Sequence, residues 1–259
     1  MLTATLALRG WGVHLPESDP SACRPDAAAG LLGRKGLLGR DDATRLALCA
    51  VHRALGLEAG VRPGGDARTD VAVVACGNLG NVDTVADLAR TATTDGVRAV
   101  SPLAAPNASS NVIASVVAIW FRFAGPNLMV CSGAAASYDA LATAALLLRA
   151  GRARRVVVVG AEAATGTATA LYGQSLTSGA ACVIVESAPD GVRVRLNGSV
   201  PAPVTAASWG DCYGAQGLVG VALAADRVRA TGGPVEVSCG GGTDGYRSLT
   251  VSSGSVGAR

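Results

Sequence analysis

The residues with the clearest chemical meaning lie where an apolar strand, Asn127 to Cys131, runs into a long Ala- and Leu-rich helix that opens at Ala134. Enzymes often place a nucleophile at such a turn, because the helix N-terminus offers its dipole and free N–H groups to a thiolate or an oxyanion. The residue at the opening position is alanine, whose methyl group cannot attack a substrate. The turn therefore predicts a scaffold for nucleophilic chemistry without the nucleophile.

Three other residues are candidates for chemistry: Ser132, Asp211 and Cys212. A carboxylate beside a thiol could perform acid–base or nucleophilic work on a bound substrate. The structural alternative, which we favour, is that Asp211 caps a helix that begins at Tyr213. Ser132 could donate a hydrogen bond in a pocket, but we favour a role in satisfying the polar groups of its own turn.

The remaining reactive residue types form no motif. The two histidines are His14, in an early loop, and His52, inside a helix, and we expect both to be ordinary surface or loop residues. The seven cysteines are widely spaced and include no C-x-x-C pair, so no metal site is predicted. Neither a G-x-S-x-G turn nor a nucleotide-binding glycine motif occurs, and we expect no cofactor.

Composition limits the class of protein. The chain has 259 residues, of which 49% are hydrophobic and 16% charged, which predicts a packed globule. A net charge of +3 with scattered arginines argues against a nucleic-acid partner. Residues 1–9 lack the features of a signal peptide, and no apolar run is long enough to span a membrane. Together with the unpaired cysteines, this predicts a cytoplasmic protein with no membrane partner.

Apolar runs alternate with helical patterns along most of the chain, which predicts an α/β layered fold with largely parallel strands. A possible join between two units falls at 187–191. The expected strands are 3–8, 70–76, 127–131, 155–160, 180–186, 192–197, 234–239 and 248–251, and the expected helices are 41–55, 82–92, 109–123, 134–149 and 213–230.

The order of motifs resembles the β-ketoacyl synthases, condensing enzymes of the thiolase fold. The most specific match is Gly125-Pro126-Asn127-Leu128, which directly precedes the catalytic strand in that family. The resemblance implies a single ketosynthase-like domain over 1–259 with α-β-α-β-α layers. It divides the domain into a nearly complete N-terminal half, 1–187, and a truncated C-terminal half, 188–259. Further matching segments are 70–80, 106–110, 134–151, 156–162, 178–186, 210–217 and 240–244.

The departures from the family concern its catalytic residues. The nucleophilic cysteine of the family would fall at Ala134, and one of its histidines would fall at Asp211. Cys131 lies within the strand and cannot replace a side chain on the turn. The family's other histidine segment has no counterpart, because the chain runs almost directly from Asn197 to Gly210. We therefore expect no condensing activity from this chain on its own.

The resemblance implies a role in polyketide or fatty-acid-type biosynthesis. Our first hypothesis is a pseudoenzyme that pairs with an active ketosynthase, in the manner of a chain-length factor. In the family the strand matching Asn127 to Cys131 pairs with a second subunit, so a homodimer or a ketosynthase heterodimer is implied, with an acyl carrier protein as a further partner. The alternative is a stand-alone isomerase, cyclase or acyl-transfer enzyme that acts on a carrier-bound acyl chain through Asp211 and Cys212. A remnant without function is disfavoured by the intact hydrophobic periodicity.

Overall fold

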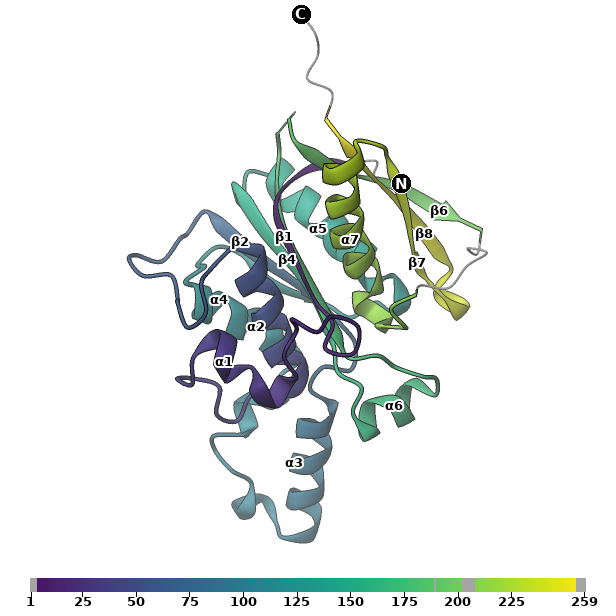
Figure 1. Ribbon diagram of the computed structural model, residues 1–259. Coiled ribbons are helices and arrows are strands. Elements are labelled where there is room, and N and C mark those ends of the chain that lie inside the picture. The colour runs from purple at the N-terminus through teal and green to yellow at the C-terminus, as the bar shows by residue number, and fades with distance from the viewer. Residues whose placement is uncertain (1–3, 189, 202–207, 255–259) are drawn as a thin grey trace, which may run out of the picture.

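The computed structural model describes residues 4–188, 190–201 and 208–254. Its strands form one eight-stranded sheet in the order β3-β2-β4-β5-β1-β6-β8-β7 (Figure 1). The strands are β1 (Thr5–His14), β2 (Val71–Cys76), β3 (Asn127–Val130), β4 (Arg155–Glu162), β5 (Gly179–Glu186), β6 (Val192–Val200), β7 (Val235–Gly240) and β8 (Tyr246–Ser253). The α-helices are α1 (Ala29–Leu32), α2 (Asp42–Ala54), α3 (Val82–Thr94), α4 (Val112–Phe121), α5 (Ala136–Arg149), α6 (Gly166–Tyr172) and α7 (Gln216–Thr231).

Strands β2, β4 and β5 are continuous runs of valine, alanine and other small apolar residues, and they are buried along nearly their whole length. Such runs need cover on both faces of the sheet. Helices α2 and α4 pack on one face, while α5 and α7 pack on the other. Two apolar cores result, one on each side of the sheet.

The sheet continues around α7, which contacts β5 on one side and β7 and β8 on the other (Figure 1). The described residues thus form successive α, β, α and β layers, which confirms the layered α/β class. Along β6 the side chains alternate between buried and exposed. The exposed face carries a polar network, in which Glu236 accepts hydrogen bonds from Ser248 and Thr250 at 2.9 and 2.6 Å. Asn197 donates to the same group.

The expected parallel pairing is wrong for most of the sheet. Only β2–β3 and β2–β4 are parallel, and the other five strand pairs are antiparallel. Helices α4 and α5 cross the sheet between β2, β3 and β4, and such crossovers return the chain in the same direction. The connection from β4 to β5 contains only the short α6, and the chain comes back antiparallel.

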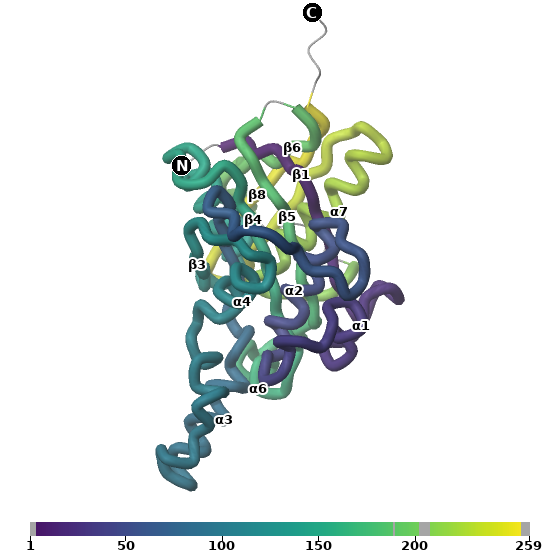
Figure 2. Tube along the Cα trace, turned by 90° about the vertical axis from the view of Figure 1, so that its left-hand side faces the viewer, coloured from purple at the N-terminus to yellow at the C-terminus, as the bar shows by residue number. Residues whose placement is uncertain are grey.

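Most predicted elements are present, with shifted ends. Strand β1 continues to His14, and Asp41 caps α2 by accepting a hydrogen bond from the Thr44 N–H at 2.7 Å. The sequence patterns did not predict α1 or α6. Helix α3 has no buried residues and projects from the body of the molecule (Figure 2). None of the described helices is long and apolar enough to cross a membrane.

Candidate functional site

The turn after β3 has the predicted strand-to-helix form. A 3₁₀ turn, η4 (Gly133–Ala135), leads directly into α5, and Ala134 is 9% exposed. The backbone N–H of Ala134 donates to a carboxylate oxygen of Asp244 at 2.8 Å. In a nucleophilic enzyme this N–H would face the reacting oxygen, but here it is already hydrogen-bonded to the Asp244 carboxylate.

Asn78 holds this turn in place. Its side-chain oxygen accepts from the Gly133 N–H at 2.9 Å, and its amide nitrogen donates to the Gly133 carbonyl at 3.0 Å. Gly133 has φ of +70°, and a side chain there would collide with Asp244. The turn therefore requires glycine at this position for its conformation and for the approach of the carboxylate.

Glu162 lies beneath the turn and is fully buried. Its carboxylate accepts from the backbone N–H groups of Asn78 and Leu79 at 2.6 and 3.1 Å. Burial raises its pKa to about 7, although these hydrogen bonds act in the opposite direction. The neighbouring strands β2, β3 and β4 are parallel, so their carboxyl ends share one edge of the sheet. Asn78 follows β2, Gly133 follows β3, and Glu162 is the last residue of β4.

Asp211 contributes from the other half of the chain. One carboxylate oxygen accepts from the Tyr213 N–H at 2.8 Å, and the other accepts from the Tyr172 hydroxyl at 2.6 Å. The predicted helix start is wrong: the 3₁₀ turn η5 (Tyr213–Ala215) begins at Tyr213, its N-cap residue is Cys212, and α7 begins only at Gln216. Asp211 precedes the N-cap and accepts the Tyr213 N–H two residues along the chain, which is a local turn contact. The two tyrosine rings lie 4.3 Å apart between centroids, which packs the unpredicted α6 against this turn.

The other two candidates do not line the cavity at this turn. Cys212 is fully buried, and burial raises its pKa to about 12, which disfavours the reactive thiolate. Ser132 is exposed and donates to Asp139 at 2.6 Å within the start of α5. Cys131 is also exposed, and it follows β3, which ends at Val130, so the expectation that it lies within the strand is wrong.

A cavity of about 450 Å³ joins these elements. Ala134, Asp244, Asp211 and Tyr172 line it, together with Asn78 and the glycine-rich segment 240–242. The positions of the absent nucleophile and of Asp211 therefore share one cavity. Both carboxylates in it are already hydrogen-bonded to protein donors, and within the described part of the chain no histidine lines it.

The expectation that both histidines are surface or loop residues is wrong. His14 ends β1 and His52 lies within α2, and both are at most 1% exposed. They are buried because α2 packs on the face of the sheet formed by β1, β4 and β5. Their Nε2 atoms contact the carbonyl oxygens of Cys23 and Glu58 at 2.9 and 3.0 Å.

Sequence patterns singled out Ala134, Ser132, Asp211 and Cys212. They assigned no role to the residues that build the cavity around them. A usable signal was that Asn78 and Glu162 lie at the carboxyl ends of predicted buried strands. The contact between Asp244 and Ala134 has no local signal, because it joins distant parts of the chain. The residues around the cavity to which the sequence patterns assigned no role are Asn78, Glu162, Tyr172, Tyr213 and Asp244.

Residues 23–186 match the sequence model of the family described as "Beta-ketoacyl synthase, N-terminal domain". A comparison with curated proteins finds no significant sequence match.

Three solved structures have a similar fold. The ishigamide ketosynthase/chain length factor is 20% identical with a TM-score of 0.72, over 96% of this chain and 99% of that chain. A type II PKS acyl-carrier protein in complex with its ketosynthase is 13% identical with a TM-score of 0.72, and the match covers 97% of this chain and 100% of that chain. A ketosynthase in complex with its chain length factor from Xenorhabdus doucetiae is 15% identical with a TM-score of 0.62, and the match covers 96% of this chain and 99% of that chain. These likenesses extend the shared fold beyond the matched N-terminal residues, and the chain belongs to the β-ketoacyl synthase family.

Proposed function

We propose that this chain is a non-condensing partner subunit of an active ketosynthase in polyketide or fatty-acid-type biosynthesis. The observation that carries the proposal is the turn at Ala134. A condensing enzyme needs a side chain there that carries the acyl group and N–H donors that stabilise developing negative charge. Here the side chain is a methyl group, and the Asp244 carboxylate already accepts the Ala134 N–H. Both features oppose condensation at this site.

The similar structures support pairing with a ketosynthase. Two of them are described as a ketosynthase with a chain length factor, and the third as a ketosynthase with an acyl-carrier protein. By analogy we propose that this chain pairs with a ketosynthase, or with a second copy of itself, and that a carrier protein delivers the acyl chain to the pair.

We propose β3 as the contact between the subunits. It is one of the two edge strands of the described sheet and pairs with β2 on one side only. Leu128 on this strand is 40% exposed, and Cys131 follows it on the surface. An edge strand with free backbone groups can pair with a strand from another chain.

Co-expression with a ketosynthase encoded beside this chain tests the proposal. We expect the two proteins to co-purify, and we expect loss of the chain to change the activity or the product length of the synthase. Leu128→Arg should abolish co-purification, because it places a charge at the proposed contact. The matched control is Leu38→Arg, since Leu38 is 93% exposed and lies in a loop far from Leu128 in the sequence. The proposal fails if the proteins never co-purify and the synthase keeps full activity and product length alone.

We place this pairing in the cytoplasm. All seven cysteines are free thiols, and unpaired thiols persist in reducing compartments. A fluorescent fusion of the full chain that follows a cytoplasmic marker through cell fractionation would agree with this placement, and enrichment in an exported fraction would contradict it.

A second candidate is supported by the contact between Asp211 and Tyr172 in the cavity. A carboxylate hydrogen-bonded to a phenol can position a proton donor for an isomerase, cyclase or acyl-transfer reaction on a carrier-bound acyl chain. The buried Cys212 thiol does not favour a nucleophilic step. This candidate requires turnover by the purified chain alone, lost in Asp211→Asn and Tyr172→Phe but kept in Ser132→Ala. Absence of turnover with acyl-carrier thioesters would eliminate it.

A further inference from the structure

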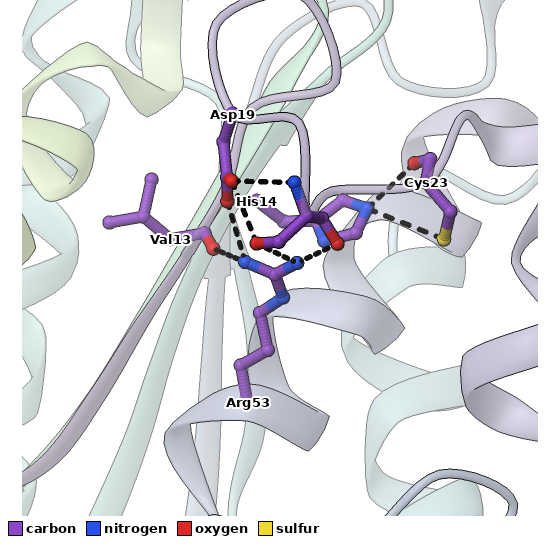
Figure 3. Close-up of polar contacts among 6 residues, drawn as sticks. Val13, His14, Asp19, Cys23 and Arg53 are labelled. Carbon is purple, nitrogen blue, oxygen red and sulfur yellow. Dashed lines mark hydrogen bonds and ion pairs between the residues drawn. The ribbon is translucent and has the colours of Figure 1, made fainter.

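Three potential metal ligands meet on the face of the sheet that α2 covers. His14 ends β1, Cys23 lies in the following loop, and Cys49 lies within α2. Their ligand atoms are all within 4.8 Å of one another. The Nε2 atom of His14 is 3.9 Å from the Cys23 sulfur (Figure 3). Two thiols and an imidazole thus converge on one point.

The two ring nitrogens of His14 differ in their contacts. Its Nε2 contacts the Cys23 carbonyl at 2.9 Å, while within the described part of the chain Nδ1 is buried without a hydrogen-bond partner. Binding a metal through Nε2 would place the ring proton on Nδ1, and the bond to the metal would replace the hydrogen bond between Nε2 and the Cys23 carbonyl.

The spacing suits a small thiophilic cation. Zn²⁺ has bonds of about 2.3 Å to sulfur and about 2.0 Å to nitrogen, so tetrahedral geometry separates two such ligands by about 3.5 Å. The 3.9 Å between Nε2 of His14 and the Cys23 sulfur is close to that value. Thiolate and imidazole donors favour Zn²⁺ and Cu⁺ over magnesium or calcium.

Neighbouring residues hold the Cys23 loop against α2. The Arg53 guanidinium bonds to the Asp19 carboxylate at 2.8 Å and to the Val13 carbonyl at 3.1 Å (Figure 3). It also donates to the Ser21 carbonyl at 2.5 Å. This network fixes both ends of the segment that brings Cys23 to His14.

We propose that His14, Cys23 and Cys49 form a binding site for a thiophilic d¹⁰ cation, either Zn²⁺ or Cu⁺. Each cysteine gives up its thiol proton on binding, so Zn²⁺ with two thiolates and a neutral imidazole leaves the site without net charge and releases two protons. A fourth position remains for water. The bound ion would tie the loop after β1 to α2, a structural role that is independent of the proposed ketosynthase partnership.

Metal retention by the purified full chain tests the site. The chain is reduced, stripped with a chelator, loaded with Zn²⁺ or anaerobically with Cu⁺, and desalted before metal analysis. We expect one equivalent of at least one of the two ions to remain, with a rise in the melting temperature. Competition with a chromophoric chelator for each ion shows which of the two is preferred. With Co²⁺ as a spectroscopic probe, we expect a thiolate-to-metal charge-transfer band.

Cys23→Ser is the informative variant, because Cys23 is partly exposed in a loop and its replacement should leave the fold intact. We expect it to weaken metal affinity by at least ~10-fold, since even residues that only support a ligand have effects of that size. The matched control is Cys131→Ser, which removes an exposed thiol elsewhere and should bind like the wild type. Circular dichroism checks that each variant is folded.

Two results would overturn the proposal. One is failure of the reduced wild-type chain to retain either ion. The other is equal retention by wild type and a folded Cys23→Ser variant. Mass spectrometry of the reduced protein supplies a further check, because a Cys23–Cys49 disulfide that persists under the reducing conditions would show that the thiols pair with each other in place of a metal, which would also overturn the proposal.

Discussion

Replacing Glu162 with glutamine should change how the stability of this protein depends on pH. Glu162 is fully buried under the turn at Ala134, and burial raises its pKa from 4.5 to about 7. Between these values the folded protein binds a proton that the unfolded chain has released. The contribution of Glu162 to stability is therefore fully present at low pH and is lost as the pH rises from about 4.5 to about 7. The two values are about 2.5 apart, which corresponds to about 3 kcal/mol.

The wild-type curve alone will not show this loss, because His14 acts in the opposite direction. Burial lowers the pKa of His14 from 6.5 to about 4, so the folded state binds fewer protons than the unfolded state in that interval. Its contribution makes the protein more stable as the pH rises from about 4 to 6.5. The two effects overlap and nearly cancel in the wild type. The difference between wild type and Glu162→Gln isolates the glutamate, since His14 and all other groups are shared.

The measurement is urea unfolding followed by tryptophan fluorescence, at several values from pH 4.5 to pH 8, with a chelator present. The stability of Glu162→Gln relative to wild type should rise by about 3 kcal/mol across this interval. The matched control is Glu58→Gln, since Glu58 is an exposed residue and its curve should run parallel to the wild type. A difference between wild type and Glu162→Gln that stays constant with pH would refute the reasoning, because it would mean that Glu162 is ionised throughout.

Three further predictions concern the same site. Gly133→Ala should destabilise the protein by about 1–3 kcal/mol in urea unfolding, because φ is +70° and a methyl group would collide with Asp244; a loss no larger than that of Gly166→Ala, where nothing lies near, would contradict this. Ser137→Ala should cost about 1–3 kcal/mol, because the buried hydroxyl donates to a carbonyl in η5 at 2.6 Å; an unchanged melting temperature would argue against that bond. Burial and its carboxylate partner raise the pKa of Tyr172, so absorbance titration to about pH 11 should give the same change for wild type and Tyr172→Phe. A smaller change in the variant would show that Tyr172 ionises normally.

Much of the fold could be predicted because its elements have strong local signals. The valine and alanine runs of β2, β4 and β5 and the cap of α2 at Asp41 are visible in short windows of sequence. The direction of β5 was not visible, since it depends on whether the connection before it crosses the sheet. Helix α6 is short and has a single buried residue, so it lacks the periodicity that would have revealed it.

For the candidate site too, some features could be predicted from the sequence and others depend on tertiary contacts. The sequence by itself determined that alanine occupies the turn before α5, and it indicated that Asp211 bonds to the backbone just after it, because both depend on neighbours along the chain. Only the tertiary structure decided that the Asp244 carboxylate binds the N–H of Ala134, that Cys212 is buried away from the cavity, and that His14 meets two cysteines. These contacts join segments brought together by sheet pairing and helix packing, so the spacing of residues along the chain does not predict them.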